Sequence, residues 1–261
     1  EYTTEMEPVE LVIARDFAAA RHTVDSEGGR GGSYVVTPGG AWCRRLFIVG
    51  ALTERRGSVD VMQARVADPT GTFRVSMDRQ TPDAGETLGY IEPPAFVAVT
   101  GRATIVGSGP RAYATVDAEA LRVVDRTARD LWVQKTAGTT LDRLIALGEA
   151  LSGDGDERAA STLRLYGTTE EAIRDMAGMV RTALAAVRPG TVPGDIGFVP
   201  RRDVLLDALD DEGGTRGVSV DDAVAAGVRS GLSAREARAA LEELLAAGEC
   251  YQPASGMVKL I

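Results

Sequence analysis

The sequence predicts a mixed fold: a small β-barrel, a helical region behind it, and a C-terminal unit of helices and a hairpin. Apolar and polar residues alternate along most of residues 34–125, which is the period of half-buried strands. The apolar spacing changes to three and four residues across 126–188, which is helical. A segment rich in proline and glycine, residues 189–200, is expected to be a linker before a last helical pattern in 201–261.

Composition indicates a globular protein rather than a membrane protein or an enzyme. The chain has 261 residues, of which 44% are hydrophobic and 26% charged, and a length of this kind favours two folded units. No stretch approaches the ~18 apolar residues of a membrane span, and no leader is recognised, so we expect a soluble, cytoplasmic protein. One histidine and two distant cysteines offer no zinc cluster and no nucleophile–base pair. We therefore expect no metal, no other cofactor and no catalytic activity.

Residues 1–33 are expected to form a short helix and a flexible loop. Apolar residues at helical spacing, among them Val12 and Phe17, predict an amphipathic helix across Pro8–Arg21. The glycine-rich run Gly28–Gly32 predicts a loop. A phosphate cradle is disfavoured there, because no strand leads into the run and no Gly-Lys-Ser/Thr follows it.

Five principal strands make up the predicted barrel, with a helix over Pro82–Leu88 between the third and the fourth. The strands are expected over Arg44–Thr53, Val61–Ala67, Gly71–Met77, Ala95–Val106 and Arg111–Asp117, with shorter ones over Tyr34–Thr37 and Leu121–Val124. The first principal strand is apolar on both of its faces, which predicts burial on both sides. This set is typical of a Greek-key barrel of the oligonucleotide-binding (OB) type. An immunoglobulin-like sandwich is the alternative, although it would need about seven evenly spaced strands.

A hairpin around Asp68-Pro-Thr-Gly71 carries the candidate binding surface. Proline fixes φ and glycine tolerates a positive φ, so this segment can turn tightly. Phe73 and Val75 share one face of the second arm and are expected in the core. Arg65 and Arg74 occupy the opposite, polar face, where they would form a surface able to meet an anion.

Two amphipathic helices are predicted behind the barrel, over Thr127–Leu151 and Thr168–Val187. We expect Thr127 to cap the first of them. Apolar stripes of this kind indicate either core or a subunit interface. We therefore treat 126–188 as a helical assembly region.

The C-terminal pattern has the layout of a winged helix, with a hairpin turning at Pro253–Gly256. Three helices precede that hairpin, over Arg201–Leu209, Val220–Arg229 and Ser233–Ala247. Residues 201–261 hold seven basic and eleven acidic side chains, a net charge of −4. Two arginines and three glutamates lie on the third helix, the usual reader of a DNA groove: Arg235, Arg238, Glu236, Glu242 and Glu243. Phosphate repulsion then favours protein docking over duplex reading.

Several stretches of the chain resemble one known family. They are Tyr34-Val-Val-Thr-Pro-Gly-Gly40, Leu46–Glu54, Ala64–Phe73 and Pro93–Gly101, with Arg15–His22 and Leu165–Thr168 in support. In combination they resemble the archaeal replication protein A-associated family and, more distantly, the middle subunit of eukaryotic replication protein A, which also places a winged helix after an OB barrel. The resemblance covers most of the chain.

That resemblance implies single-stranded DNA binding in DNA replication and repair. It also implies a larger replication protein A subunit as partner, with the helices after the barrel as the assembly element. Other replication or repair proteins would dock on the winged helix, and no membrane is involved. Two alternatives remain open: a protein-interaction subunit with little DNA binding of its own, and a winged-helix transcription regulator.

Single-strand binding requires cations for the phosphates and flat side chains for the bases, each base stack contributing about 1–3 kcal/mol. The candidate contact residues are Arg44, Arg45, Arg65, Arg74, Phe96, Arg102, Arg111 and Tyr113. Any one of the arginines is equally well read as a solvated surface charge, and Phe96 fits the core as well as a stacking platform. Arg74 and Ser76 stand on the third strand where an outward aromatic would be expected, and residues 41–125 hold ten basic and ten acidic side chains. Both features predict a low intrinsic affinity.

Overall fold

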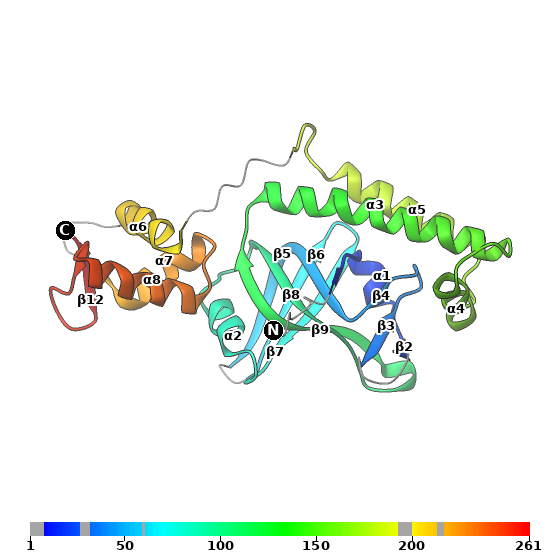
Figure 1. Cartoon of the computed structure of the whole chain (residues 1–261), viewed down its shortest axis with the longest axis horizontal. Coiled ribbons are helices and arrows are strands. Elements are labelled where there is room, and N and C mark those ends of the chain that lie inside the picture. The colour runs from blue at the N-terminus through cyan, green and yellow to red at the C-terminus, as the bar shows by residue number, and fades with distance from the viewer. Residues whose placement is uncertain (1–7, 27–31, 59–60, 193–199, 213–216) are drawn as a thin grey trace, which may run out of the picture.

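The computed structural model describes residues 8–26, 32–58, 61–192, 200–212 and 217–261. Figure 1 shows a central barrel, two long helices running alongside it, and a C-terminal unit at one end. No helix within these residues is long and apolar enough to cross a membrane. Most of the predicted glycine-rich loop and most of the predicted linker lie outside the described residues.

Five strands pair into a closed barrel, whose course can be followed in Figure 1. They are β5 (Arg45–Ser58), β6 (Val61–Asp68), β7 (Gly71–Met77), β8 (Ala95–Val106) and β9 (Tyr113–Val123). They pair in the order β5-β6-β7-β9-β8, and β8 pairs back with β5. The β7–β9 pair is parallel and the others are antiparallel. With α2 (Pro82–Gly89) between the third and fourth strands, this is the OB barrel that the strand pattern predicts.

The first barrel strand is longer than expected, because β5 serves two neighbours. Its first half pairs with β8 and its second half, out to Ser58, pairs with β6. Gly50 lies where the strand passes from one partner to the other, and a Cβ there would be 2.4 Å from the Ala67 carbonyl oxygen. The strand ends in polar residues. A prediction based on apolar alternation therefore leaves out its last five residues.

Aromatic side chains from outside the barrel pack against its core. Phe73 of β7 is buried, with its ring centroid 5.9 Å from that of Phe17 and 6.4 Å from that of Trp132. The indole Nε1 of Trp132 donates a hydrogen bond of 2.8 Å to the carbonyl oxygen of Phe47 in β5. A helix before the barrel and a helix after it are therefore both fixed to the same core.

The N-terminal segment is not the single helix expected over Pro8–Arg21. It consists of β1 (Val9–Glu10), which pairs with β5, then α1 (Ala14–Ala18) and β2 (His22–Asp25). The Asp68 carboxylate accepts a hydrogen bond from the Ala14 N–H at 2.8 Å, where α1 begins. The apolar spacing is correct, since Phe17 is buried, but the strand edge and this carboxylate take the backbone groups that a longer helix would use.

The predicted strand over Tyr34–Thr37 forms, but outside the barrel. As β3 (Ser33–Val36), it lies between β2 and β4 (Trp42–Cys43) in a separate three-stranded sheet. The two segments expected over Arg111–Asp117 and Leu121–Val124 are one continuous strand, β9. A register shift opposite Thr100 and Gly101 lets β9 follow the curved β8 without interruption.

Three helices follow the barrel where two were predicted. They are α3 (Arg126–Leu151), α4 (Glu157–Tyr166) and α5 (Glu170–Ala185). The N-cap of α3 is Asp125 rather than Thr127, and its carboxylate accepts a hydrogen bond from Ala128 N–H at 2.7 Å. Helix α4 was missed because its apolar residues are few and only Ala159 and Thr162 are buried.

The C-terminal unit combines three helices with a small sheet. Its elements are α6 (Arg201–Glu212), β10 (Val218–Ser219), α7 (Val220–Arg229), α8 (Ala234–Ala247), β11 (Cys250–Tyr251) and β12 (Met257–Leu260). Strand β12 lies between β10 and β11, which confirms the predicted terminal hairpin. The N-terminus of α8 contacts α2 and the barrel, since Ala234 N–H donates to Thr87 Oγ1 of α2 at 2.9 Å and Glu236 pairs with Arg122 of β9.

The turn between β6 and β7 depends on one carboxylate. Asp68 Oδ1 accepts hydrogen bonds from Thr70 N–H at 2.6 Å, Thr70 Oγ1 at 2.7 Å and Gly71 N–H at 3.0 Å, while Oδ2 accepts from Ala14 N–H. Burial raises the pKa of the Asp68 carboxyl, and these donors partly offset that by favouring its ionised form. One side chain thus closes the hairpin and starts α1.

We predict that Asp68→Ala lowers the free energy of unfolding by about 1–3 kcal/mol, because three donors at the turn and one at the start of α1 lose their acceptor. Urea unfolding monitored by circular dichroism measures this. Asp142→Ala, on the exposed side of α3, is the matched control and should change stability by less than about 0.5 kcal/mol. Equal stability of the two variants would contradict the role given to Asp68.

Candidate nucleic-acid interface

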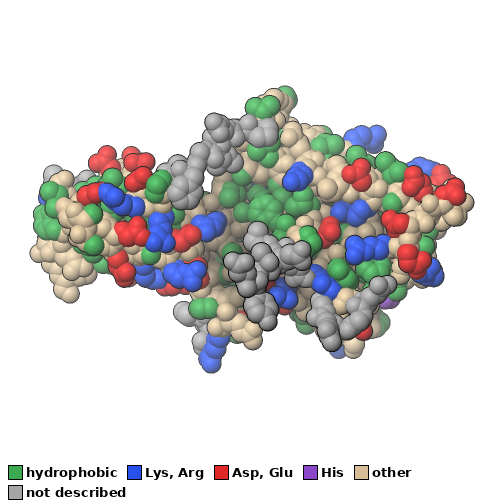
Figure 2. Space-filling view, in the orientation of Figure 1, with side chains coloured by type: hydrophobic (Ala, Val, Ile, Leu, Met, Phe, Trp, Pro, Cys, Tyr) green, Lys and Arg blue, Asp and Glu red, His purple; other side chains and the backbone are tan. Residues whose placement is uncertain are grey.

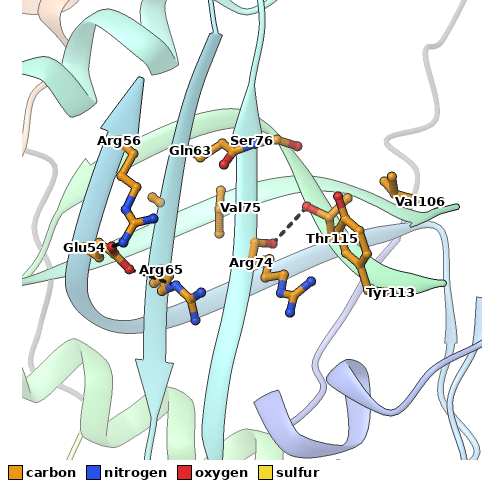
Figure 3. Close-up of a pocket in the computed structure, with 11 residues that line it drawn as sticks. Glu54, Arg56, Gln63, Arg65, Arg74, Val75, Ser76, Val106, Tyr113 and Thr115 are labelled. Atoms are coloured by element: carbon orange, nitrogen blue, oxygen red, sulfur yellow. Dashed lines mark hydrogen bonds and ion pairs between the residues drawn. The ribbon is translucent and has the colours of Figure 1, made fainter. Parts of the chain in front are cut away.

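A groove of 470 Å³ crosses the outward face of β6 and β7 (Figure 3). The end of β5 borders it on one side, and the β8–β9 hairpin borders it on the other. Its main polar lining consists of Glu54, Arg56, Gln63, Arg65, Arg74, Ser76, Tyr113 and Thr115. The groove brings together three of the residues predicted from sequence to contact DNA, namely Arg65, Arg74 and Tyr113.

Strand register places these side chains in one row. Glu54 of β5 is opposite Arg65 of β6, and Arg65 is opposite Arg74 of β7. Like charges directly opposite each other destabilise a sheet, so both arginines need compensating neighbours. Arg65 Nε lies 2.9 Å from Glu54 Oε2, and Arg74 Cζ lies 4.6 Å from the ring centroid of Tyr113. Figure 3 shows the row running from Glu54 across the hairpin to Tyr113.

Arg65 and Arg74, the two groove arginines that were predicted from sequence, differ in electrostatic character. Arg65 shares the Glu54 carboxylate with Arg56, so much of its charge is neutralised. For Arg74, no carboxylate of the described residues lies within ion-pair distance, and its guanidinium rests on the Tyr113 ring. The Arg74 carbonyl oxygen also accepts a hydrogen bond from Thr115 Oγ1 at 3.2 Å, which ties β7 to β9 at this point. Arg74 is therefore the groove cation best able to meet a phosphate.

A second polar cluster adjoins the groove on β8 and β9. Asp117 accepts hydrogen bonds from Ser76 Oγ at 2.6 Å and Thr104 Oγ1 at 2.7 Å. Farther along, one carboxylate, Glu119, pairs with two predicted contact residues: its Oε2 is 2.6 Å from Arg45 Nε and its Oε1 is 3.2 Å from Arg102 Nε. Both arginines therefore lie on the outward face but share a neutralising partner.

The remaining predicted residues lie apart from the groove lining. Arg111 is exposed in η1 (Gly109–Arg111), the short 3-10 turn two residues before Tyr113. Arg44 lies beside the separate small sheet, with its Cζ 4.2 Å from the ring centroid of Tyr34. Phe96 is half-buried at the other end of β8, six residues from Arg102 and thus about 20 Å along the strand. The structure does not bring Arg44 or Phe96 to the groove.

Some groove residues were not anticipated from the sequence. Glu54 and Arg56 lie beyond the strand end predicted at Thr53, in a polar stretch that has no apolar alternation to reveal it. Gln63 could have been found, because it lies two residues before Arg65 on the same strand and therefore on the same face. Thr115 could have been found in the same way, because it lies two residues after Tyr113 on β9 and therefore on the same face.

The described residues contain no group of three or more histidine, cysteine, aspartate or glutamate side chains that could hold a metal ion. Cys43 and Cys250 are free, buried thiols, and burial raises the pKa of each, which keeps them protonated.

No protein-family model matches the chain, and no curated protein matches it. Solved structures that match include the Stn1–Ten1 complex of S. pombe, at 15% identity and a TM-score of 0.40 over 49% of this chain and 88% of that one. A replication protein A heterotrimer bound to ssDNA matches at 17% identity and a TM-score of 0.39, over 52% and 98%. The mitochondrial single-stranded DNA binding protein Rim1 of S. cerevisiae matches at 13% identity and a TM-score of 0.27, over 32% and 95%. Similarity at these levels does not establish a shared function.

Proposed function

We propose that this chain binds single-stranded DNA through the barrel groove, as a subunit of an archaeal replication protein A complex in DNA replication and repair. One observation carries the proposal: Arg65, Arg74 and Tyr113 line a single groove on the outward face of an OB barrel. A single strand supplies the matching groups, since its phosphates meet guanidinium groups and its bases stack on flat side chains.

The stacked pair of Arg74 and Tyr113 is suited to both tasks. A guanidinium held over a ring keeps its plane exposed to a base, and its N–H groups can still donate to a phosphate. Because the ring restrains the arginine before DNA arrives, less side-chain entropy is lost on binding. Arg111, in the turn that leads to Tyr113, is placed to add a second phosphate contact.

We propose that the helices after the barrel form the interface with a larger subunit. Helices α3 and α5 pack along each other beside the barrel (Figure 1), yet they leave apolar side chains exposed. Leu141 and Ile145, which is 61% exposed, lie four residues apart on one side of α3, and Leu184 of α5 is exposed as well. A helix of the larger subunit packed on this surface would cover these side chains.

The C-terminal unit has the chain order of a winged helix, and we propose that it docks other replication or repair proteins. Its third helix, α8, would enter a DNA groove with its N-terminal end. That end already contacts α2 through Ala234 and Arg235, whose N–H donates to Asp83 at 2.9 Å, and it contacts β9 of the barrel through Glu236. Figure 2 shows acidic and basic side chains mixed over this unit. Both features favour protein docking over transcriptional control through duplex DNA.

We predict that Arg65→Ala combined with Arg74→Ala weakens binding of a mixed-sequence oligonucleotide of about 20 nucleotides by about tenfold, because the groove loses its phosphate contacts and its stacked cation. Fluorescence anisotropy measures the affinity, and thermal melting checks folding. Arg181→Ala, an exposed arginine on α5, should leave the titration unchanged. An unaltered curve for the double variant would exclude the groove as the binding surface.

We also predict a shallow salt dependence. Glu54 and Glu119 are each paired with two arginines, and Arg74 is the groove arginine with no ion pair among the described residues, so about one or two phosphates should gain a cation that is not already ion-paired. The slope of log K against log salt should then lie between about −0.7 and −1.4. A series of anisotropy titrations at increasing salt measures it, and a slope steeper than about −3 would contradict the proposed pairing.

Leu141→Glu with Ile145→Glu should abolish co-purification with the larger subunit, because two charges would be buried against its apolar surface. Single-strand binding by the isolated chain should persist. Lys135→Glu introduces a charge at an exposed position on the same helix and should leave the complex intact. Normal complex formation by the double variant would place the interface elsewhere.

A further inference from the structure

The groove holds hydrogen-bond acceptors as well as cations. Glu54 lies inside it with a side chain that is 31% exposed, and Asp117 is exposed at its edge, where Ser76 donates to it. Phosphate binding alone does not account for two carboxylates on this surface. An ionised carboxylate has about four acceptor positions. Each of these two carboxylates has a protein partner at each oxygen among the described residues, so acceptor positions remain on both.

We infer that the groove selects single strands by base, and that Glu54 and Asp117 favour bases with an exocyclic amino group over thymine and uracil. The inference rests on the proposed function, since bases are read only if the strand lies in the groove. Cytosine, adenine and guanine each present an N–H₂ donor, which a carboxylate accepts. Thymine and uracil present a single N–H donor on this edge, at N3, and it lies between the carbonyl oxygens at C2 and C4, which a carboxylate repels.

Ion pairing explains how Glu54 can sit in a site for a polyanion. Arg56 and Arg65 bind its carboxylate from two sides, and the three charges together leave one net positive charge. Repulsion of phosphate is therefore offset locally. The two arginines also hold the carboxylate in one orientation, so an acceptor is in place before a base arrives (Figure 3).

The row across the hairpin places the Glu54 carboxylate within reach of a base that is stacked on the Arg74–Tyr113 pair. Glu54, Arg65 and Arg74 lie in register on three neighbouring strands, so Glu54 and Arg74 are two strand spacings, about 10 Å, apart at the backbone. Both side chains rise from the same face. A base stacked on the Arg74–Tyr113 pair can then turn its hydrogen-bonding edge toward Glu54, because the side chains span much of that distance.

The test compares oligo-dC with oligo-dU of about 12 nucleotides, by fluorescence anisotropy at mildly alkaline pH, where cytosines remain unprotonated. Both are pyrimidines without a methyl group, so stacking area is matched and the hydrogen-bonding edge differs. We expect oligo-dC to bind the full chain at least about fivefold more tightly. Glu54→Gln with Asp117→Asn should bring the ratio close to one, chiefly by strengthening oligo-dU.

Glu92→Gln is the matched control, since Glu92 is exposed, pairs with Arg55 and does not line the groove; it should keep the wild-type ratio. Equal binding of the two oligomers by the wild type, or tighter binding of oligo-dU, would overturn the inference and leave the proposed function standing. A preference that survives in the double variant would overturn the assignment to these carboxylates. Failure to bind either oligomer would overturn the proposed function, and the inference with it.

Discussion

The register of the β6–β7 hairpin is the constraint on which the candidate site depends. Side chains alternate between the two faces of a strand, so a slip of one residue would turn Arg65 and Arg74 inward and bring Phe73 to the surface. Asp68 opposes such a slip, because one of its carboxylate oxygens accepts hydrogen bonds from three donors of the turn. It also accepts from the start of α1, whose Phe17 packs on Phe73. Turn, core and binding face are thus fixed together.

Charge neutralisation shapes the chemistry of the outward face. Glu54 and Glu119 each hold two arginines, which leaves Arg74, stacked on Tyr113, as the distinctive cation of the groove. Counterion release would contribute little to the free energy of binding a single strand on such a surface, and stacking and hydrogen bonding would contribute more. For the proposed subunit of a larger complex, weak binding by this chain alone would suffice, because linked sites raise the overall affinity.

The barrel and two groove arginines could be predicted from sequence because they depend on local alternation. Arg65 and Arg74 flank a recognisable turn, and the period of two assigns their face directly. Glu54 could not be placed, because its position opposite Arg65 is set by the pairing of β5 with β6 and by the register shift between Leu52 and Glu54. The prediction of one helix over Pro8–Arg21 was wrong for a related reason. Asp68, more than fifty residues away in the chain, determines where α1 begins.

Amide chemical-shift mapping of the isotope-labelled full chain with a short single-stranded oligonucleotide tests the central claim most directly. The account predicts that the largest shifts fall on Arg65, Arg74 and Tyr113, with smaller changes at Ser76 and Arg111. Shifts confined to α8 or to the exposed side of α3, with the hairpin unaffected, would contradict the assignment of the barrel groove as the nucleic-acid interface.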